Sequence, residues 1–421
     1  MKTLFRNGTV FCADGGFRQA DILSQDGVVI RVADGIAADA DRVFDLRGLH
    51  IFPGFADAHV HLREPGFSYK ETIASGSMAC AHGGYTTVCA MPNLDPPIDS
   101  DAHLRMEEEL IQRDAVIRVL PYASITRGRL GQGEIVDMAA LSGRVCGFSD
   151  DGTGVSDENV MRQAMTLCRE AGSIIAAHCE DLSLIPKGAA IHDGAYARAH
   201  GLPGIPSESE WGPIKRDLAL CRETGCAYHV CHISAKESLD LIKAARAEGV
   251  NVTCETAPHY LLLSEDDLQD EGRFKMNPPL RTKEDRDALR QGFINGDIDM
   301  LSTDHAPHGA QEKSRGLAGS AMGIVGIETA FPLIYTHFVR TGLMSLEALV
   351  DRISLAARRR FRLDGGLLEG GRLEMCAFDL SASTVIDPDT FKSLGRATPF
   401  QGWEVYGVCQ YTVFGDRVLA F

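Results

Sequence analysis

Two hydrophobic patterns alternate regularly along the middle of the chain. Short apolar runs of strand length are separated by longer segments in which apolar residues recur at helical spacing. The predicted strands are 51–61, 86–91, 117–123, 145–149, 173–178, 227–233, 250–255 and 299–303. The predicted helices between them include 71–82, 157–171, 209–224, 235–248 and 283–295. Eight alternations over roughly 250 residues favour an α/β fold, a closed (β/α)8 barrel of the TIM type.

The two ends of the chain have a different pattern, in which short strands are joined by glycine and aspartate turns. At the amino-terminal end the predicted strands are 3–11, 20–24, 28–32 and 43–46. At the carboxyl-terminal end they are 375–380, 384–386, 404–409, 411–414 and 417–421. We expect these ends, residues 1–50 and 365–421, to pair into a small β domain beside a barrel domain of residues 51–364.

Composition narrows the functional classes. The 421 residues carry a formal charge of −16, from 58 acidic and 42 basic residues, and contain no block of Lys and Arg. This balance argues against nucleic acid and anionic membranes as partners. No apolar run approaches the roughly 20 residues needed to cross a bilayer, and the first residues lack the apolar core of a signal peptide. Twelve scattered cysteines without a C-x-x-C pair predict reduced thiols and a cytoplasmic protein.

The end of the first barrel strand carries the most informative motif, DAHVHLREPG (57–66). Side chains alternate along a strand, so His59 and His61 project to the same side and can hold one divalent metal. A chance His-x-His within a strand is the alternative. Arg63 weakens that alternative, because its guanidinium supplies an anion-binding fork next to the histidines.

Further candidate ligands follow the other predicted strands. The chemistry of such barrels lies at the carboxyl ends of their strands. The polar residues found there are Asp150 and Asp151 at the end of strand four, His178 at the end of strand five, His232 at the end of strand six and Asp304 at the end of strand eight. Four His and two Asp at one rim match the ligand set of a two-zinc hydrolytic site. Any single one could instead be a hydrogen-bonded core residue, but six together favour the metal site.

The motifs together resemble those of the bacterial dihydroorotases, a family of the amidohydrolase superfamily. The resemblance spans residues 53–330 and rests on DAHVHLREPG, GGYTTVCAMPN, GFSDDG, HCED, CHIS, KMNPPLR, TDHAPH and GIVGIETA. It implies a (β/α)8 barrel with two Zn²⁺ ions per chain. The implied reaction interconverts dihydroorotate and N-carbamoyl-L-aspartate in pyrimidine (UMP) biosynthesis.

The resemblance also assigns the metal ligands. It implies that His59, His61 and Asp304 hold one zinc and that His178 and His232 hold the other. Many superfamily members bridge the metals with a carboxylated lysine, but no lysine occurs here between Lys70 and Lys187. The related dihydroorotases use an aspartate together with a hydroxide. Strand alternation favours Asp151 for this bridge, since it shares a face with the small Gly147 and Ser149, and leaves Asp150 as the alternative.

The same resemblance predicts the catalytic and substrate-binding residues. Asp304 takes a proton from the attacking hydroxide and passes it to the leaving nitrogen. Arg63 and Asn93 bind the substrate carboxylate, although a surface salt bridge from Arg63 to Glu64 or Glu71, or a turn-capping role for Asn93, is the alternative. The other predicted substrate contacts are His61, Asn277, His308 and the backbone at Met322 and Gly323. His259 and His305 are expected to surround the site, whereas His229 and six other histidines receive no role.

Two alternatives remain at this stage. One is another cyclic-amide hydrolase, such as a hydantoinase or allantoinase, which the missing strand-four lysine and the Arg63–Asn93 pair oppose. The other is a catalytically silent scaffold for aspartate transcarbamoylase, in which loss of ligands is expected and none is found. The resemblance further suggests that the protein forms a homodimer and associates with aspartate transcarbamoylase. Its substrates are expected to be small molecules only.

Overall fold

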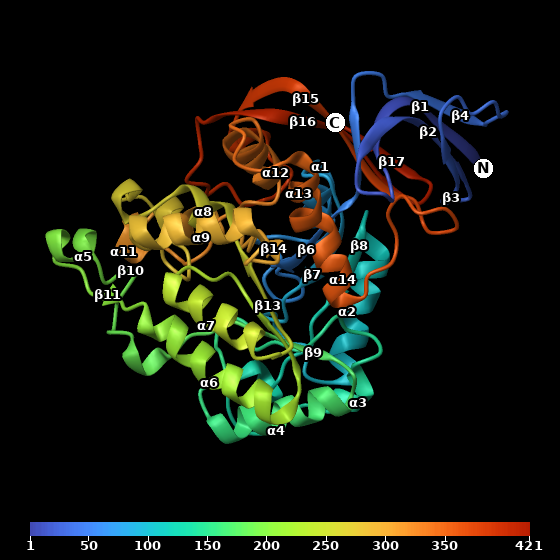
Figure 1. Ribbon diagram of the computed structural model, residues 1–421. Helices are drawn as coiled ribbons and strands as arrows, with labels where there is room; N and C mark the ends of the chain where they lie inside the picture. Colours follow the sequence, from blue (N-terminus) through green and yellow to red (C-terminus); the bar gives the residue numbers. More distant parts are fainter.

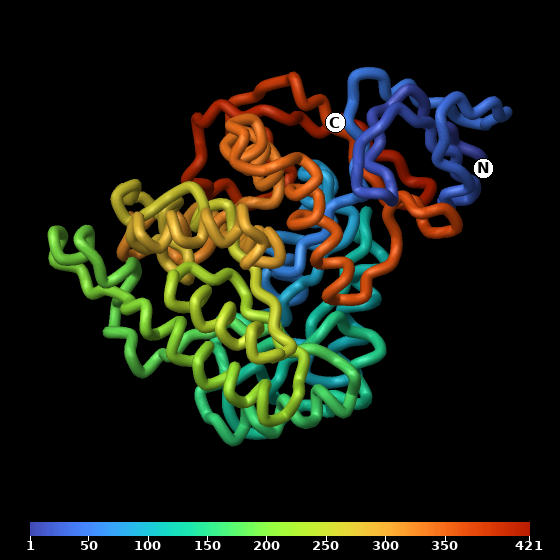
Figure 2. The backbone as a smooth tube through the Cα atoms, in the orientation of Figure 1, coloured from blue at the N-terminus to red at the C-terminus, as the bar shows by residue number.

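The computed structural model describes residues 1–421 as a barrel with a β sheet at one side (Figure 1). The sheet contains strands from both ends of the chain in the order β17-β16-β15-β5-β1-β2-β3, with β4 paired to β1. Its strands are β1 (Lys2–Phe11), β2 (Phe17–Gln25), β3 (Val28–Ala33), β4 (Arg42–Asp45), β5 (His50–Pro53), β15 (Glu374–Val385), β16 (Glu404–Phe414) and β17 (Arg417–Ala420). Figure 2 shows the two ends of the chain running together there.

The barrel strands pair in parallel in two groups. One group is β6 (Phe55–Val60), β7 (Tyr85–Ala90) and β8 (Arg118–Pro121). The other is β9 (Ile174–Ala177), β12 (Ala227–Val230), β13 (Val252–Thr256) and β14 (Met300–Leu301). Parallel bridges close the circle, because Phe148 pairs with both Ala123 and Ile175, and Val60 pairs with His305. The predicted strand 145–149 is therefore present only as the pairing of Phe148, too short to form a regular strand.

Helices surround the barrel (Figure 1). Those that were predicted are α1 (Ile73–His82), α4 (Glu158–Glu170), α6 (Glu208–Thr224), α7 (Lys236–Ala247) and α9 (Lys283–Asn295). The others are α2 (Asp101–Asp114), α3 (Met138–Leu141), α5 (Ala195–His200), α8 (Pro258–Leu262), α10 (Ala310–Lys313), α11 (Gly316–Gly319), α12 (Ala330–Ile334), α13 (Leu346–Val350) and α14 (Ala356–Phe361). Strands β10 (Ile191–His192) and β11 (Gly204–Ile205) form a small separate pair. No helix combines the length and the apolar character that a bilayer crossing requires.

The predicted strand 51–61 is divided between the two parts of the molecule. Residues His50–Pro53 form β5 in the terminal sheet, and Phe55–Val60 form β6 in the barrel. Gly54 lies at the break, where a Cβ atom would approach the Thr86 side chain to 2.2 Å. Only glycine fits this close passage, so the chain can leave one sheet and enter the other within a single residue. The terminal sheet thus extends a few residues past position 50.

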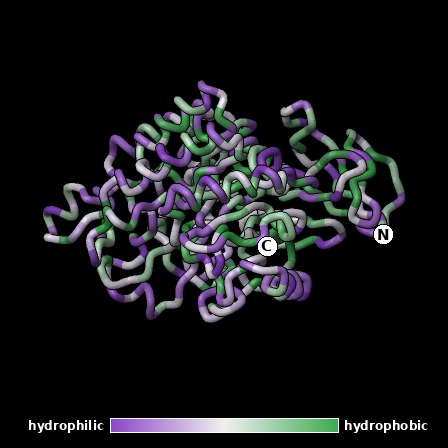
Figure 3. The backbone as a smooth tube through the Cα atoms, turned by 90° about the horizontal axis from the view of Figure 1, so that it is seen from below, coloured by the Kyte–Doolittle hydropathy of each residue, from purple (hydrophilic) through white to green (hydrophobic).

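Aromatic side chains join the terminal sheet to the barrel. Phe52 of β5, Phe55 of β6, Phe331 of α12 and Phe378 of β15 are buried and contact one another with ring centroids 4.4 to 5.8 Å apart. They belong to the largest hydrophobic cluster of the molecule. Figure 3 shows hydrophobic and hydrophilic segments alternating along the backbone throughout. Burial of large rings across the junction holds the two parts in a fixed arrangement.

Candidate metal and substrate site

The six predicted ligands converge at the carboxyl ends of the barrel strands. All six are buried: His59, His61, Asp151, His178, His232 and Asp304. Five of them line a cavity of about 260 Å³, and His59 lies directly behind it, with its Nε2 atom 3.4 Å from Asp151 Oδ1. The strand ends therefore lie together as predicted, and alternation along the strands accounts for the direction of His59, His61 and Asp151.

Asp151 occupies the centre of this group. Its carboxylate oxygens lie 3.4 to 3.8 Å from ring nitrogens of His59, His61, His178 and His232. Burial alone raises the pKa of Asp151, but the surrounding histidines outweigh burial and hold it well below its usual range. The carboxylate is thus kept ionised between two pairs of imidazoles.

Asp150 points elsewhere. Its carboxylate accepts hydrogen bonds from the backbone N–H groups of Ile125, Thr126 and Gly131 and from the Thr126 hydroxyl. These bonds hold the loop that follows β8, so Asp150 has a structural role next to the site. The alternation argument thus distinguishes the two neighbouring aspartates.

Asp304 lies close to both histidines of the first strand. Its Oδ1 atom is 2.9 Å from His61 Nε2 and 3.6 Å from His59 Nε2. Burial raises the pKa of Asp304, yet the hydrogen bond from His61 and the neighbouring imidazoles bring it down to about 2. Asp304, His232 and Arg63 have positive φ angles of 45°, 32° and 62°. Such conformations are costly for residues other than glycine and concentrate at functional sites.

Two buried ring nitrogens in the group have no hydrogen-bond partner, His59 Nε2 and His232 Nδ1. Buried polar atoms are almost always satisfied, so each such atom calls for an explanation. Among the six predicted ligands, two sets of side chains can each bring three ligand atoms within 4.8 Å of one another: His59–His61–Asp151 and Asp151–His178–His232. Both sets share Asp151. The donor types and their spacing fit two divalent metals on either side of one carboxylate.

A second layer of carboxylates orients the histidines, and the sequence analysis missed it. Glu255, at the end of β13, has its Oε1 atom 3.1 Å from His59 Nδ1 and its Oε2 atom 3.1 Å from His229 Nε2. Burial raises its pKa, but the bonds to the two histidines outweigh burial and keep the carboxyl ionised. Glu180 Oε2 lies 3.3 Å from His178 Nε2. Glu180 follows a predicted strand and Glu255 is the last residue of one, so their positions at strand ends were the available signal.

Asp57 is a further acid of this layer and lies within the motif itself. It accepts hydrogen bonds from the backbone N–H groups of His59 and Thr303 and from the Thr303 hydroxyl. The first and last barrel strands are thereby connected directly below the site. Burial raises the pKa of Asp57 to about 7.

The predicted substrate contacts line the same cavity as the ligands. They are His61, Arg63, Asn93, Asn277, His308, Met322 and Gly323. Arg63 is buried, and the only hydrogen bond of its side chain runs from Nε to the Pro307 carbonyl at 3.2 Å. Neither Glu64 nor Glu71 pairs with it, since Glu64 accepts from the Ile73 backbone and Glu71 from Ser75, Ser393 and Leu394. A buried guanidinium without a carboxylate partner is prepared for an anionic ligand.

Asn93 does not act as a turn cap. Its Oδ1 atom is 2.9 Å from His61 Nδ1, and its Nδ2 donates to Asp151 Oδ2 at 3.2 Å. Asn277 donates to Glu180 Oε1 at 2.9 Å. Both amides therefore connect the ligand group to the cavity wall, and the His61 ring is held in one orientation.

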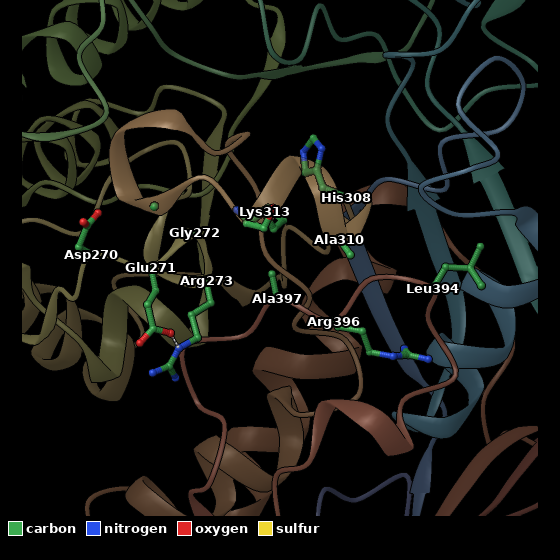
Figure 4. Close-up of a pocket in the computed structure, with 12 residues that line it drawn as sticks. Asp270, Glu271, Gly272, Arg273, His308, Ala310, Lys313, Leu394, Arg396 and Ala397 are labelled. Atoms are coloured by element: carbon green, nitrogen blue, oxygen red, sulfur yellow. Dashed lines mark hydrogen bonds and ion pairs between the residues drawn. The ribbon is translucent and has the colours of Figure 1, made fainter.

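The segment around Met322 and Gly323 is fixed by a half-buried lysine. Lys313 Nζ donates to the backbone carbonyls of Lys275, Ala321 and Gly323 at 2.6 to 3.0 Å. Gly323 has φ 131°, and a Cβ there would approach the Ala306 carbonyl oxygen to 2.7 Å, so this position requires glycine. Figure 4 shows Lys313 beside His308 in an adjoining cavity of about 410 Å³.

His308 lies at the boundary of the two cavities. Its Nε2 atom is 2.7 Å from the Met322 carbonyl oxygen and its Nδ1 atom is 3.3 Å from Lys70 Nζ. Burial, together with the nearby charges of Arg63 and Lys70, lowers the pKa of His308 to about 3. The ring is therefore neutral, with Nε2–H donated to Met322 and Nδ1 as the acceptor.

The remaining predicted neighbours also lie in the core. His305 is buried, with its Nε2 atom 3.5 Å from Glu71 Oε2, and His259 is buried without a partner for Nε2. Burial lowers the pKa of His259 to about 4. His229, which the sequence analysis left without a role, contacts Glu255 as described. All twelve cysteines are unpaired, as expected for reduced thiols.

Known proteins resemble this chain over its whole length. A family model described as dihydro-orotase-like matches residues 48–238. A protein named dihydroorotase from Anoxybacillus flavithermus is 45% identical, over 100% of this chain and 98% of the relative. Another from Shouchella clausii is 48% identical, over 95% of this chain and 93% of the relative. A third, from Listeria monocytogenes, is 47% identical, over 95% of this chain and 94% of the relative.

Solved structures share the fold. The L-hydantoinase (dihydropyrimidinase) of Arthrobacter aurescens superimposes with a TM-score of 0.88 at 26% identity, over 99% of this chain and 96% of the other. The dihydropyrimidinase of Brevibacillus agri superimposes with a TM-score of 0.86 at 23% identity, over 100% of this chain and 95% of the other. At that identity the similarity shows the fold alone. The predicted barrel with its small β domain is confirmed. With relatives of nearly half-identical sequence along its full length, the chain belongs to the dihydroorotase family.

Proposed function

We propose that this chain is a dihydroorotase, a hydrolase that interconverts dihydroorotate and N-carbamoyl-L-aspartate in pyrimidine biosynthesis. Its relatives of 44 to 48% identity carry that name. The observation that carries the proposal is the pairing, in one cavity, of a buried His/Asp group with the unpaired guanidinium of Arg63. The first suits hydrolysis of an amide and the second suits a substrate with a carboxylate.

Two zinc ions are the proposed cofactors. His59, His61 and Asp304 would hold one, His178 and His232 would hold the other, and Asp151 would contact both. The unpartnered His59 Nε2 supports this assignment, as does the position of Asp151 among four imidazoles, where His232 presents its Nε2 atom. When bound, such metals act as Lewis acids toward the carbonyl oxygen and make water acidic enough to attack at neutral pH.

Asp304 is the proposed general base and acid. Its carboxylate takes a proton from the attacking water, and the water oxygen forms a bond to the ring carbonyl carbon. The carbon–nitrogen bond then breaks, and Asp304 returns the proton to the departing nitrogen. In the reverse direction the same carboxylate removes the proton from the attacking nitrogen. The buried position beside His61 holds the carboxylate ionised and ready to accept the proton.

The substrate is oriented by side chains on the cavity wall. Arg63 would bind the carboxylate through two parallel N–H donors, and Asn93 would assist from the next strand. His61, Asn277 and His308 would contact the ring, and backbone groups at Met322 and Gly323 would bind its amide edge. Rigid support from Lys313 favours this role for the backbone, because a fixed donor or acceptor loses little entropy on binding.

A hydantoinase-like activity is the second candidate, since the solved structures of similar fold carry that name. Asp151 at the end of strand four and the unpaired Arg63 favour dihydroorotase. A silent scaffold is disfavoured because all six candidate ligands are present and face one another. As further proposals, the enzyme is cytoplasmic, forms a homodimer and associates with aspartate transcarbamoylase. Light scattering of the purified protein, alone and mixed with the transcarbamoylase, tests the last two.

The test of the proposed function is turnover by the isolated, zinc-loaded chain. We expect dihydroorotate to be hydrolysed, and hydantoin and allantoin to be poor substrates. Treatment with a chelator should abolish turnover, zinc should restore it, and metal analysis should approach two zinc per chain. Preferred turnover of hydantoin would establish the second candidate. A fully active protein with a single stable metal would contradict the two-metal assignment.

A further inference from the structure

A second polar cavity lies at the opposite end of the barrel from the metal site. It measures about 410 Å³ and is lined by residues at the amino-terminal ends of the strands, including Ile174 of β9 and Ala227 of β12. The candidate ligands His178 and His232 follow the carboxyl ends of the same two strands. Four strand residues separate the two ends, roughly 13 Å at the usual rise. The cavity is therefore distinct from the proposed active site.

Three arginines give this cavity its charge. Arg359, Arg360 and Arg362 line it, together with the polar side chains of Ser142, Ser173 and Asn251, and no carboxylate belongs to the lining. The arginines come from the end of α14, which is orange in Figure 1. In a chain with a net charge of −16, a concave surface whose charged lining residues are all arginines favours small anions.

Arg360 is the fixed member of the three. Its Nη1 donates to Asn251 Oδ1 at 2.6 Å, and its Nη2 donates to the carbonyls of Tyr228 and Asn251 at 2.7 and 3.1 Å. Its Nε is buried and has no partner. The three acceptors that Arg360 contacts are all neutral, so the charge of this half-buried guanidinium is not paired within the molecule. Burial also lowers the pKa of Arg360, because the charged guanidinium is partly removed from water.

Arg362 is the free member. It caps α14 in the left-handed conformation with φ 55°, and its exposed side chain makes no hydrogen bond or ion pair. Arg359 is exposed and bound to Asp351 through two contacts of 2.7 and 3.0 Å. Three guanidinium groups therefore surround one cavity. That of Arg360 is held rigidly, that of Arg362 is free to bind a ligand, and that of Arg359 is partly neutralised by Asp351.

We propose that this cavity is a binding site for the phosphate group of a small metabolite. At neutral pH a phosphate group carries close to two negative charges and has several acceptor oxygens. A carboxylate carries one charge and has only two oxygens, so a phosphate matches three guanidinium groups better. The hydroxyls of Ser142 and Ser173 add donors of the kind that complete such sites. A volume of about 410 Å³ exceeds that of free phosphate and falls in the range of sites for whole metabolites.

The test measures phosphate binding to the zinc-loaded enzyme by titration calorimetry, with inorganic phosphate, pyrophosphate and a nucleoside monophosphate as probes. Arg362→Gln and the double variant Arg359→Gln/Arg362→Gln remove charge from the cavity without disturbing Arg360. Arg31→Gln is the matched control, because Arg31 is exposed on β3 and its side chain makes no hydrogen bond or ion pair. We expect pyrophosphate affinity to fall at least about tenfold in the double variant and to be unchanged in the control.

A localised readout separates this cavity from the active site, which also attracts anions. Phenylglyoxal labelling followed by peptide mass spectrometry reports the accessibility of Arg362 directly. Protection of Arg362 by pyrophosphate would support the proposal, and tighter binding of the nucleotide than of free phosphate would identify a metabolite as the ligand. Equal affinity in all variants, or full labelling of Arg362 at saturating pyrophosphate, would overturn it.

Discussion

Oε1 of Glu255 lies 3.1 Å from Nδ1 of His59, deep in the barrel between β6 and β13. Glu255 is fully buried and accepts the Nδ1 proton, so the lone pair of His59 Nε2 faces Asp151 and Asp304. A carboxylate behind a ligating histidine fixes its tautomer and increases its basicity. Glu255 is thus a positioning residue for the proposed metal site, although it lines no cavity.

Glu255→Gln should weaken zinc binding about 10- to 100-fold, the range found for such outer partners. The amide keeps the shape but no longer carries the charge that stabilises the Nδ1–H form of His59. The measurement is zinc content after dialysis against a graded series of chelator concentrations. Glu170→Gln, on the exposed face of α4, is the control. Unchanged zinc retention in Glu255→Gln would show that His59 needs no such support.

The residues that sequence reasoning found share one property: their positions follow from strand order alone. Asp151 and Asp304 follow predicted strands within two residues, whereas His59 and His178 lie in the last residues of predicted strands. The barrel brings such positions to one rim whatever the details of packing. The choice of Asp151 over Asp150 needed only the alternation of side chains along a strand.

The residues that were missed depend on tertiary contacts. Glu255 reaches His59 across 196 positions of sequence, and nothing in the local pattern distinguishes it from any other strand-end acid. The break at Gly54 was missed for a similar reason, since the close contact with Thr86 exists only in the assembled molecule. Short apolar runs predict that strands exist, but not which sheet each strand joins.

Arg63→Lys should lower kcat/KM for dihydroorotate, by an amount that corresponds to a loss of about 2–4 kcal/mol of transition-state stabilisation. Lysine retains the charge but cannot present two parallel donors to a carboxylate, and the backbone of Arg63, at φ 62°, leaves little freedom to compensate. The measurement is steady-state kinetics with dihydroorotate and with dihydrouracil, the same ring without the carboxylate. Dihydrouracil turnover should be equal in the two enzymes. A normal kcat/KM for dihydroorotate would mean that another residue binds the carboxylate.

Stability should depend on pH through Glu107. This residue is buried on α2, its Oε2 has no partner, and burial, together with the charge of Glu64, raises its pKa to about 8. An unfolded glutamate titrates near pH 4.3. Between about pH 5 and 8 the folded state therefore binds a proton that the unfolded state lacks. Stability falls as pH rises through this interval, by up to about 1.4 kcal/mol per pH unit.

Glu107→Gln mimics the protonated form and should remove this dependence. The variant and the parent should unfold with similar free energies near pH 5, and the variant should be the more stable near pH 8. Urea denaturation at both pH values measures the difference, with Glu109→Gln, an exposed neighbour on the same helix, as the control. A parent and a variant whose stabilities run parallel from pH 5 to 8 would show that Glu107 is ionised in the folded protein.

Asp304→Asn separates the two roles proposed for Asp304, ligand and base. Asparagine keeps the shape and one oxygen that can face a metal, but it cannot accept the proton. We expect the variant to bind dihydroorotate and to retain at least the zinc at His178 and His232. Its kcat should fall at least about 10²-fold, the lower end of general acid–base contributions. Zinc analysis and ligand titration, run beside the kinetics, distinguish a lost base from a lost metal. If kcat stays near normal with both metals bound, the neutral Nδ1 of His308 becomes the group that carries the proton.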